Sequence, residues 1–387
     1  MLVVVSPNRV AVRVEQESEM FPPPTGPTTS PEQIRELDDA YFAGDVAGYF
    51  HNRVDSLVAW AQCQSVDRSS GLAGDVTQRL GLLAQDIAPI DDRLRGVQIA
   101  ADAFAVRHHA AETLIRLITA VLTAREEDEV CSIWQTIALG PTPMIEVIKN
   151  IQTALDSDES RVLFSRISVP EDILRTEASN PQLERAVRVL GSWVEHAVYL
   201  LTRNDINVNA GNNKAKHGMA IRARDDLRVM FSKEGPDASG GIAESVLNGS
   251  DTVDILDRPL LQLLSPPPSS VKPKQGLELT WLRLDAAALL AETTMLATAL
   301  GAIFHVAAKA HRDRYATPES IAPYPPFLLA LTADELLGHS VTGMRFPVTD
   351  PSDGSVNLRP SGVGFHKDFV PLIVDHAGAS KAVVTDN

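Results

Sequence analysis

The residues best suited to chemistry lie together in one short stretch, Asn-Asn-Lys-Ala-Lys-His-Gly, at positions 212–218. An imidazole can take a proton from a ribose 2′-hydroxyl or give one to a leaving oxygen near neutral pH. Lysine ammonium groups can stabilise the charge of a phosphorane, and an asparagine amide can orient a phosphate. His217 is therefore the candidate acid/base, Asn213 the orienting group, and Lys214 and Lys216 the phosphate contacts.

A helix over residues 212–222 would bring these side chains together, because residues four apart share one helical face. Asn213 and His217 have this spacing. The preceding helical pattern carries Glu195 and His196, and a short connection can return the chain so that the two helices touch. The sequence therefore predicts that these polar side chains converge.

The charge around this stretch differs from that of the whole chain. Between residues 203 and 228 there are six Lys and Arg residues against three Asp, a local balance of +3, whereas the full chain carries −15. A strongly acidic chain repels phosphate backbones, so any nucleic-acid site must depend on a local basic patch. Arg222 lies within this patch and is a further candidate for substrate binding.

The stretch 212–218 resembles the motif region of the HEPN superfamily, α-helical domains of which many are metal-independent ribonucleases in toxin and phage-defence systems. The family pattern is an arginine, a polar residue, three further residues and a histidine. Asn213 matches the polar position and His217 the histidine, and the segment 108–118 is similar to the first core helix of such domains. The resemblance implies RNA binding, RNA cleavage without metal, and pairing of two copies so that their histidines share a groove.

Asn212 occupies the position where the family has arginine. Without that guanidinium the usual phosphate clamp is missing, unless Lys214 or Lys216 replaces it imperfectly. The departure leaves two alternatives open, an active site or an inactive one that is retained for binding.

A competing interpretation makes the stretch 212–218 a solvated turn in which Asn212 or Asn213 caps a helix. The protein would then be a non-enzymatic helical scaffold that binds another protein through acidic faces and proline-rich segments. The two interpretations predict different surroundings for His217, a positively charged groove in the first case and bulk water in the second.

A metal site is a further possibility on the segment that contains His108, His109 and Glu112, whose spacings of three and four fit one helical face. No third ligand can be identified elsewhere in the sequence. These residues are therefore predicted to be structural polar groups on the flank of a helix, and neither a metal nor a cofactor is expected.

Composition favours a reduced, soluble, cytoplasmic protein. The two cysteines, Cys63 and Cys131, are isolated and have no metal-ligand spacing. The first residues lack the basic start and the cleavage site of a secretion signal. Residues 286–304 are apolar, but Glu292 and three threonines interrupt them, so a buried core helix is predicted and no membrane span.

The abundance of Ala, Leu and Val with only 5% aromatic residues predicts a mainly α protein, an irregular multi-helix bundle with a small C-terminal β-hairpin. Residues 1–30 are expected to be an extended leader and proline-rich linker, and residues 31–335 a helical domain. Residues 233–280 within it are rich in Gly, Ser and Pro and are expected to be a loop-rich excursion. Residues 336–387 form a C-terminal segment, in which a Pro-Ser-Asp-Gly turn predicts the hairpin.

Helix boundaries follow from capping residues and from apolar residues at steps of three and four. Ser30 with Pro31 and Gln33 predicts one helix start, and Asn180 with Pro181 predicts another. The predicted helices cover residues 31–43, 44–64, 71–87, 90–126, 180–205 and about 277–315, and a helical segment at 134–155 breaks at Gly140-Pro141 and then resumes as another helix.

Overall fold

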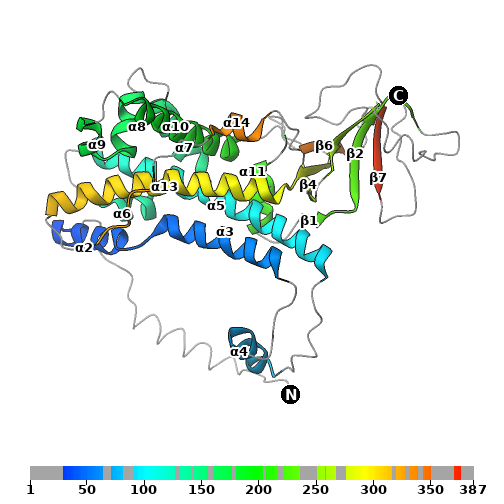
Figure 1. Ribbon diagram of the computed structural model, residues 1–387, viewed down its shortest axis with the longest axis horizontal. Helices are drawn as coiled ribbons and strands as arrows, with labels where there is room; N and C mark the ends of the chain where they lie inside the picture. Colours follow the sequence, from blue (N-terminus) through cyan, green and yellow to red (C-terminus); the bar gives the residue numbers. More distant parts are fainter. Residues whose placement is uncertain are drawn as a thin grey trace.

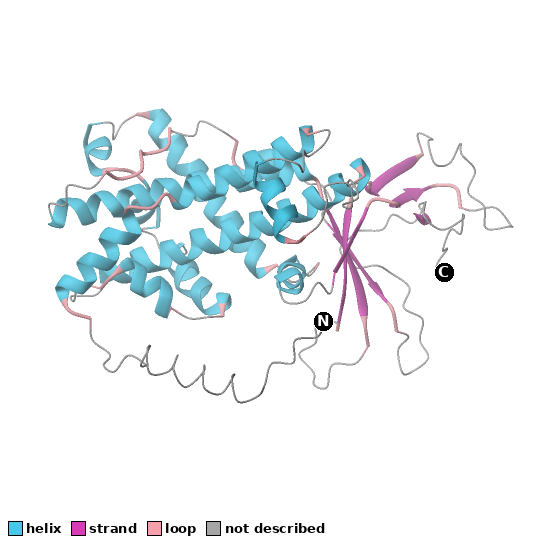
Figure 2. Cartoon of the chain, turned by 90° about the horizontal axis from the view of Figure 1, so that it is seen from below, coloured by secondary structure: helices cyan, strands magenta, loops and turns pink. Residues whose placement is uncertain are grey.

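The computed structural model describes most of the chain, apart from several connecting and terminal segments. The described residues are 29–63, 71–81, 91–126, 131–140, 143–155, 160–176, 180–203, 206, 208–216, 221–235, 251–257, 259–266, 276–315, 320–326, 331–338, 343–349 and 370–375. They form a mainly α structure, as predicted, with two small antiparallel sheets at one end of the helical body (Figure 1 and Figure 2).

Two long helices form the centre of the protein. α5 (Asp92–Glu126) and α13 (Ala286–Tyr315) pack along each other, and α3 (Val46–Gln62) and α10 (Pro181–Thr202) flank them (Figure 1). The contact between α13 and α3 is close because Gly301 has no side chain, and a Cβ there would lie 3.1 Å from that of Ala47. Leucine, isoleucine and alanine side chains from all four helices share one buried core.

The shorter helices lie around this central group, except that the helix at residues 71–79 stands apart from it (Figure 1). They are α2 (Pro31–Phe42), α4 (Gly71–Arg79), α6 (Ile133–Leu139), α7 (Met144–Leu155), α8 (Ser160–Ser168), α9 (Glu171–Thr176), α11 (Val208–Lys216) and α14 (Ala333–Leu337). α2 and α6 lie at one end of α13, α7 to α10 lie along one side of it, and α11 lies near the sheets (Figure 1).

The predicted capping residues are confirmed. The Ser30 hydroxyl accepts a hydrogen bond from the Gln33 amide, and the Gln33 side chain accepts one from the Ser30 amide, which completes a capping box. Asn180 caps α10 in a similar way, with Pro181 in the first turn. Both helices therefore start where their sequence signals place them.

The first sheet (sheet A) has the strand order β1-β4-β5-β6, and the second (sheet B) has the order β3-β2-β7. All adjacent strands are antiparallel. Their bounds are β1 Ile221–Arg224, β2 Leu227–Ser232, β3 Thr252–Leu256, β4 Leu260–Ser265, β5 Glu278–Arg283, β6 Gly343–Pro347 and β7 Val370–Asp375.

Sheet A lies between the helices and sheet B. Leu261 and Leu263 of β4 belong to the helical core, whereas Leu260 packs in a second apolar cluster with Trp281 and residues of sheet B such as Val229. The alternation of side chains along a strand produces these two faces. The protein therefore has three layers on this side, namely helices, sheet A and sheet B.

Two predictions for the region before α13 are wrong. Within the expected loop excursion, residues 252–256 and 260–265 instead form β3 and β4, and Leu260 and Leu261 are fully buried. The helix expected from about residue 277 starts at Ala286, since residues 278–283 form the central strand β5. Both segments are short and rich in leucine, a pattern that does not distinguish a buried strand from a buried helix.

The predicted C-terminal hairpin is present only in part. Its first arm is β6, but β6 pairs with β5 and not with a following strand. The residues of the expected turn and second arm, 350–369, lie outside the described residues. β7, further along the chain, belongs to sheet B. Residues 1–28 of the expected leader also lie outside the described part of the chain.

α13 is the one helix among the described residues that is long and apolar enough to cross a membrane. Of its most apolar window, 67% is buried inside the protein. This agrees with the predicted core helix, because α13 packs against α5, α3 and α10 along its length.

Candidate functional site

α11 carries most of the stretch singled out in the sequence. It begins at Val208 and ends at Lys216, so it starts earlier and ends earlier than predicted. Gly211 lets α11 approach sheet A closely, since a Cβ at this position would lie 3.1 Å from Cδ1 of Leu282. α11 also contacts α5 and α10. His217, the predicted acid/base, lies outside the described residues.

The four described polar side chains of this stretch differ in exposure. Asn212 is buried, with 2% of its surface exposed, and its Oδ1 has no hydrogen-bond partner among the described residues. Asn213 and Lys216 are exposed, and Lys214 is half-buried. The position that holds arginine in the HEPN pattern therefore points into the protein, and a phosphate clamp cannot come from it.

Arg222 does not continue the helix as predicted. It lies on β1, where it pairs with Gln262 of β4, and its side chain is exposed. Leu263 and Leu261 pair with the residues on either side of it, so β1 is held as the edge strand of sheet A. Residues 221–224 form a strand and not a continued helix because their backbone pairs with β4 and so extends the antiparallel sheet of β4 and β5.

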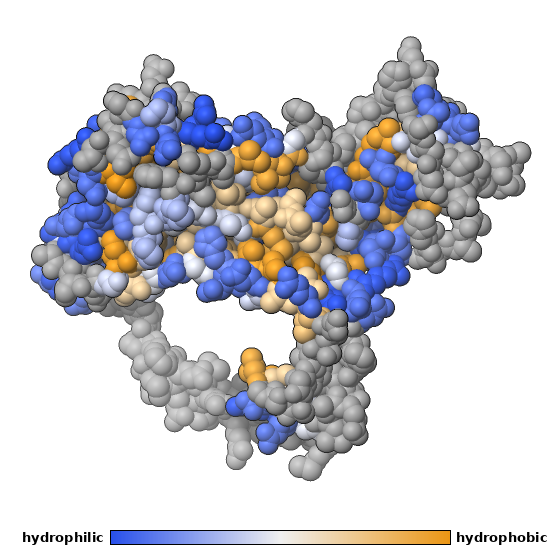
Figure 3. Space-filling model, viewed as in Figure 1, coloured by the Kyte–Doolittle hydropathy of each residue, from blue (hydrophilic) through white to orange (hydrophobic). Residues whose placement is uncertain are grey.

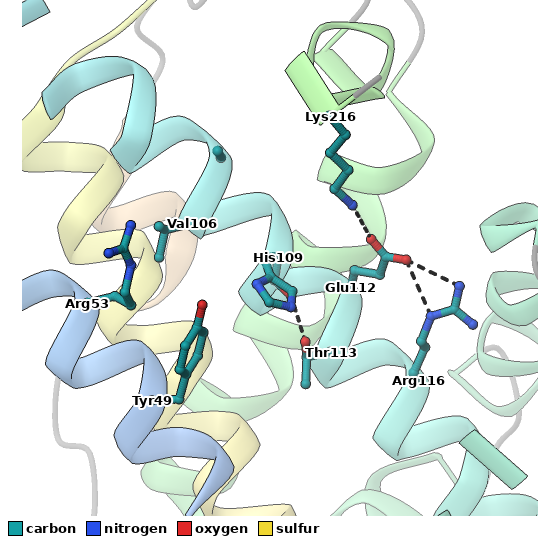
Figure 4. Close-up of a pocket in the computed structure, with 9 residues that line it drawn as sticks. Tyr49, Arg53, Val106, His109, Glu112, Thr113, Arg116 and Lys216 are labelled. Carbon is teal, nitrogen blue, oxygen red and sulfur yellow. Dashed lines mark hydrogen bonds and ion pairs between the residues drawn. The ribbon is translucent and has the colours of Figure 1, made fainter. Parts of the chain in front are cut away.

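A surface pocket of about 420 Å³ opens between α3, α5 and the end of α11. Figure 4 shows Tyr49 and Arg53 on α3, with Lys216 reaching toward α5 from the opposite side. The residues that line it are Tyr49, Arg53, Ala105, Val106, His109, Glu112, Thr113, Arg116 and Lys216. Of the predicted site residues that are described, Lys216 lines this pocket, whereas Asn213, Lys214 and Arg222 do not.

Glu112 connects α5 with α11 inside this pocket. Lys216 Nζ lies 2.8 Å from Glu112 Oε2, and Arg116 Nη2 lies 3.2 Å from Glu112 Oε1 (Figure 4). Burial raises the pKa of Glu112, but the hydrogen bond and charge of Lys216 and then those of Arg116 outweigh it, so the pKa lies below its ordinary value. Glu112 is therefore ionised at neutral pH and holds both cations at the pocket wall.

His109 is the imidazole that the structure places in this pocket. Its ring makes edge contacts with Phe50, at 5.1 Å between centroids, and with Tyr49, at 5.9 Å. Partial burial lowers the pKa of His109, the charge of Lys216 lowers it further, and Glu112 partly opposes them. The ring is thus neutral at neutral pH, a state in which one nitrogen can accept a proton.

The pocket carries a net positive charge. Arg53, Arg116 and Lys216 are three cations against the single carboxylate of Glu112, which gives +2 when His109 is neutral. Arg53 makes no ion pair with any described residue, and its side chain is exposed. An anion that enters the pocket can therefore bind Arg53 without breaking an existing pair.

A buried ionic cluster lies deeper, between α5, α10 and α13. Arg107 Nη1 is 3.2 Å from both oxygens of Glu292, and His196 Nε2 is 2.9 Å from Glu292 Oε2. Burial raises the pKa of Glu292, yet the charge of Arg107 and the hydrogen bond and charge of His196 bring it below the ordinary value. His196 is thus bound in the core, and the neighbouring Glu195 is exposed.

His108, the residue before His109, faces the core and is completely buried. Its Nδ1 lies 3.3 Å from the Phe104 carbonyl oxygen, and its Nε2 has no hydrogen-bond partner among the described residues. Burial lowers the pKa of His108 well below the ordinary value, and the charge of Arg107 lowers it further. The folded protein therefore keeps this ring neutral.

This burial predicts a stability that depends on pH. Below the ordinary histidine pKa of 6.5 the unfolded chain binds a proton at residue 108 that the folded protein does not bind. This proton stabilises the unfolded state more as the pH decreases. The contribution of His108 to the free energy of unfolding is therefore lost below pH 6.5, by about 1.4 kcal/mol per pH unit. The free energy of unfolding would be measured with urea at several pH values from 7.5 to 5.5. It should fall less steeply with decreasing pH for His108→Leu than for the wild type.

Leu114→Ala is the matched control for that measurement, because Leu114 is equally buried on the same helix and does not titrate. It should lower the free energy of unfolding by about 2–5 kcal/mol at every pH and leave the slope unchanged. Equal slopes for His108→Leu and the wild type would contradict the prediction.

The sequence patterns pointed to Lys216, and separately to His109 and Glu112 as structural polar groups on a helix flank, but not to the pocket that these residues share. Glu112 and Arg116 form an (i, i+4) pair, which is a local signal that could have been read. Tyr49 and Arg53 gave no such signal, because their approach to His109 depends on the packing of α3 against α5. Within the described ranges, no group of three or more His, Cys, Asp or Glu residues could hold a metal ion.

Comparison with known proteins identifies no family for this chain. No family model matches the sequence, and the searches of curated proteins and of solved structures return no match.

Proposed function

We propose that the protein is a cytoplasmic RNA-binding protein of HEPN-like type that holds single-stranded RNA in the pocket between α3, α5 and α11 and cleaves it without a metal ion. The observation that carries the proposal is the meeting, in one open pocket, of three cations with the neutral ring of His109. This cluster lies in a chain of net charge −15, in which a general attraction to nucleic acid is not expected.

The exposed ring of Tyr49 is the reason to propose single-stranded RNA, and not duplex RNA, as the ligand. Its ring is 50% exposed at the pocket and is held on edge against Phe50 and His109. An exposed aromatic ring beside cations is the arrangement on which unpaired bases stack while the backbone phosphates meet Arg or Lys. In this pose Arg53 and Lys216 contact phosphate.

Cleavage requires an acid and a base at the ribose. His217 is proposed as one of them, as in the family that the 212–218 stretch resembles, and Asn213, which is exposed on α11 outside the lining of the pocket, is proposed to orient the scissile group. His109 is proposed as the second imidazole, since it is neutral and lies at the pocket. Arg116 and Lys216 would stabilise the charge that develops on the phosphorane.

Binding can be tested by fluorescence anisotropy with a labelled, unstructured RNA at several salt concentrations. For a single strand the slope of log K against log salt changes by about 0.7 for each phosphate contact. Arg53→Gln should therefore weaken binding several-fold and reduce the slope by about 0.7. Lys309→Gln, a change in a Lys of α13 that pairs with Asp313, is the control and should change neither value.

The pair Tyr49→Ala and Tyr49→Phe gives a second readout of the same experiment. Loss of the ring should weaken RNA binding by about tenfold, because stacking of a base on an aromatic side chain contributes about 1–3 kcal/mol. The phenylalanine variant keeps the ring and should bind as the wild type does. Equal affinity for all four variants, or no saturable binding of RNA by the wild type, would reject the RNA-binding function.

Rejection of the RNA-binding function would favour the alternative, a non-enzymatic scaffold that binds another protein. One separate feature of the structure supports this alternative. Leu72, Val76 and Leu80 follow at steps of four in and directly after α4, and 80%, 49% and 63% of their surfaces are exposed. Apolar atoms of α4 lie on the side that faces the main helical body (Figure 3). An apolar stripe of this kind is a usual contact for a partner helix, including one from a second copy.

A further inference from the structure

A second cavity, far from the pocket of α11, lies at the other end of α13. It has a volume of about 130 Å³, opens partly to solvent and is lined by α2, the end of α5, the start of α6 and the last turns of α13. Its inner wall is apolar and well buried, with Phe42, Val121, Ile133 and Val306 each no more than 9% exposed. Ala124 and Ala307 leave the central space open, because their side chains are short.

The acids at this cavity are already occupied. Asp38 accepts hydrogen bonds from the Ser132 hydroxyl at 2.7 Å and from the amides of Ile133 and Trp134 at 3.2 and 3.1 Å. Three of the roughly four lone-pair positions of that carboxylate are thereby used. A ligand therefore finds few free acceptors on Asp38.

The second acid nearby is held by the imidazole of His311. His311 Nε2 lies 2.8 Å from Asp39 Oδ1, and the His311 ring also contacts Phe42 and Tyr315, at 5.4 and 4.9 Å between ring centroids. The imidazole is thus fixed as part of the wall. An aromatic ligand would meet three rings on this side of the cavity.

Arg314 is the one cation with a permanent charge among the lining residues. Its side chain is exposed at the cavity, and it makes no hydrogen bond or ion pair with a described residue. Guanidinium groups bind carboxylates through paired N–H donors. Arg314 is therefore available to an anion, whereas Asp38 and Asp39 are bound by their own partners.

We propose that this cavity binds a small organic monocarboxylate, with its apolar body among Phe42, Ile133 and Val306 and its carboxylate on Arg314. The size sets the class of ligand, because an apolar cavity of about 150 Å³ accommodates one benzene ring. A single aromatic ring or a short branched alkyl chain matches the volume of about 130 Å³. This site is independent of the RNA pocket, with which it shares no lining residue.

The test is isothermal titration calorimetry of the full chain with benzoate, benzyl alcohol and benzylamine, three probes with the same ring and different charge. Benzoate should bind in a saturable way, benzyl alcohol more weakly and benzylamine weakest. Arg314→Gln should weaken benzoate by about tenfold and leave benzyl alcohol unchanged. Arg312→Gln, a change on the same helix outside the cavity, is the matched control and should alter neither.

A variant that fills the space separates this cavity from other surfaces. Ala307→Leu should abolish the binding of benzoate and of benzyl alcohol, and circular dichroism would show that the variant is folded. If that variant does not fold, the comparison of Arg314→Gln with Arg312→Gln decides. No saturation by benzoate, a preference for benzylamine, or equal benzoate affinity in the Arg314 and Arg312 variants would each overturn the proposal.

Discussion

Glu292→Ala is expected to lower the free energy of unfolding by about 3–5 kcal/mol. Glu292 is 4% exposed and receives hydrogen bonds from Arg107 and His196. Its removal leaves the Arg107 guanidinium buried without a counter-charge in the centre of the helical core. Urea unfolding at neutral pH, followed by circular dichroism, measures the change.

Two further variants show whether the charge or the packing is responsible. Glu195→Ala removes an exposed carboxylate on α10 and should change the stability by no more than about 0.5 kcal/mol. Replacing the whole cluster by apolar residues, with Arg107→Met, His196→Leu and Glu292→Leu together, should restore most of the loss, because no buried charge remains unpaired. A triple variant that is less stable than Glu292→Ala would contradict this explanation.

His217→Ala is expected to reduce metal-free cleavage of RNA by about 10²- to 10⁴-fold, and His109→Ala should do the same. Each removes one of the two proposed proton-transfer groups, while the cations of the pocket remain. The rate would be measured in single-turnover reactions with EDTA present, so that binding and chemistry are separated. The affinity for RNA should change little in either variant.

The control for cleavage is His305→Ala. His305 lies on α13, where its Nδ1 is 2.8 Å from the Ala322 carbonyl oxygen, and it does not line the pocket between α3, α5 and α11. Cleavage that continues unchanged in both the His217→Ala and the His109→Ala variant, or that requires Mg²⁺, would exclude this mechanism. RNA binding without any cleavage by the wild type would instead indicate a site that is retained for binding, in line with Asn212 at the arginine position.

Local signals predicted the helices of this protein well. Ser30, Gln33 and Asn180 each act within four residues of themselves, so their sequence neighbours are enough to define a helix start. Glu292 was also informative, since an acid in an apolar segment predicted a core helix, although its partners could not be found. Those partners lie on α5 and α10, far away in the chain.

The strands were harder to predict because their stability comes from distant partners. β5 pairs with β4 on one side and with β6 on the other. Its place in the sheet therefore depends on one strand that precedes α13 in the sequence and on one that follows it. The segments Leu-Leu-Gln-Leu-Leu-Ser and Glu-Leu-Thr-Trp-Leu-Arg at 260–265 and 278–283 are too short for the apolar period to decide. Only the pairing in sheet A makes them strands.

Only the part of the candidate site that depends on neighbours in the sequence was predicted, because the rest depends on contacts between distant segments, as the strands do. Lys216 lies in the basic stretch that the sequence emphasises, and it does line the pocket. The competing interpretation placed Asn212 in a solvated turn, but Asn212 is buried, because Gly211 brings this part of α11 against sheet A. Tyr49 and His109 meet only after α3 and α5 have packed.

The pairing of α5 with α13 has a consequence for the order of events during synthesis. Arg107 and Glu292 are separated by 185 residues, so α5 leaves the ribosome long before its main partner. At about 5–20 residues per second, the apolar side of α5 waits roughly 10–40 s for α13. During that interval the nascent chain exposes a surface that chaperones recognise, and a chain truncated before residue 286 would never cover it.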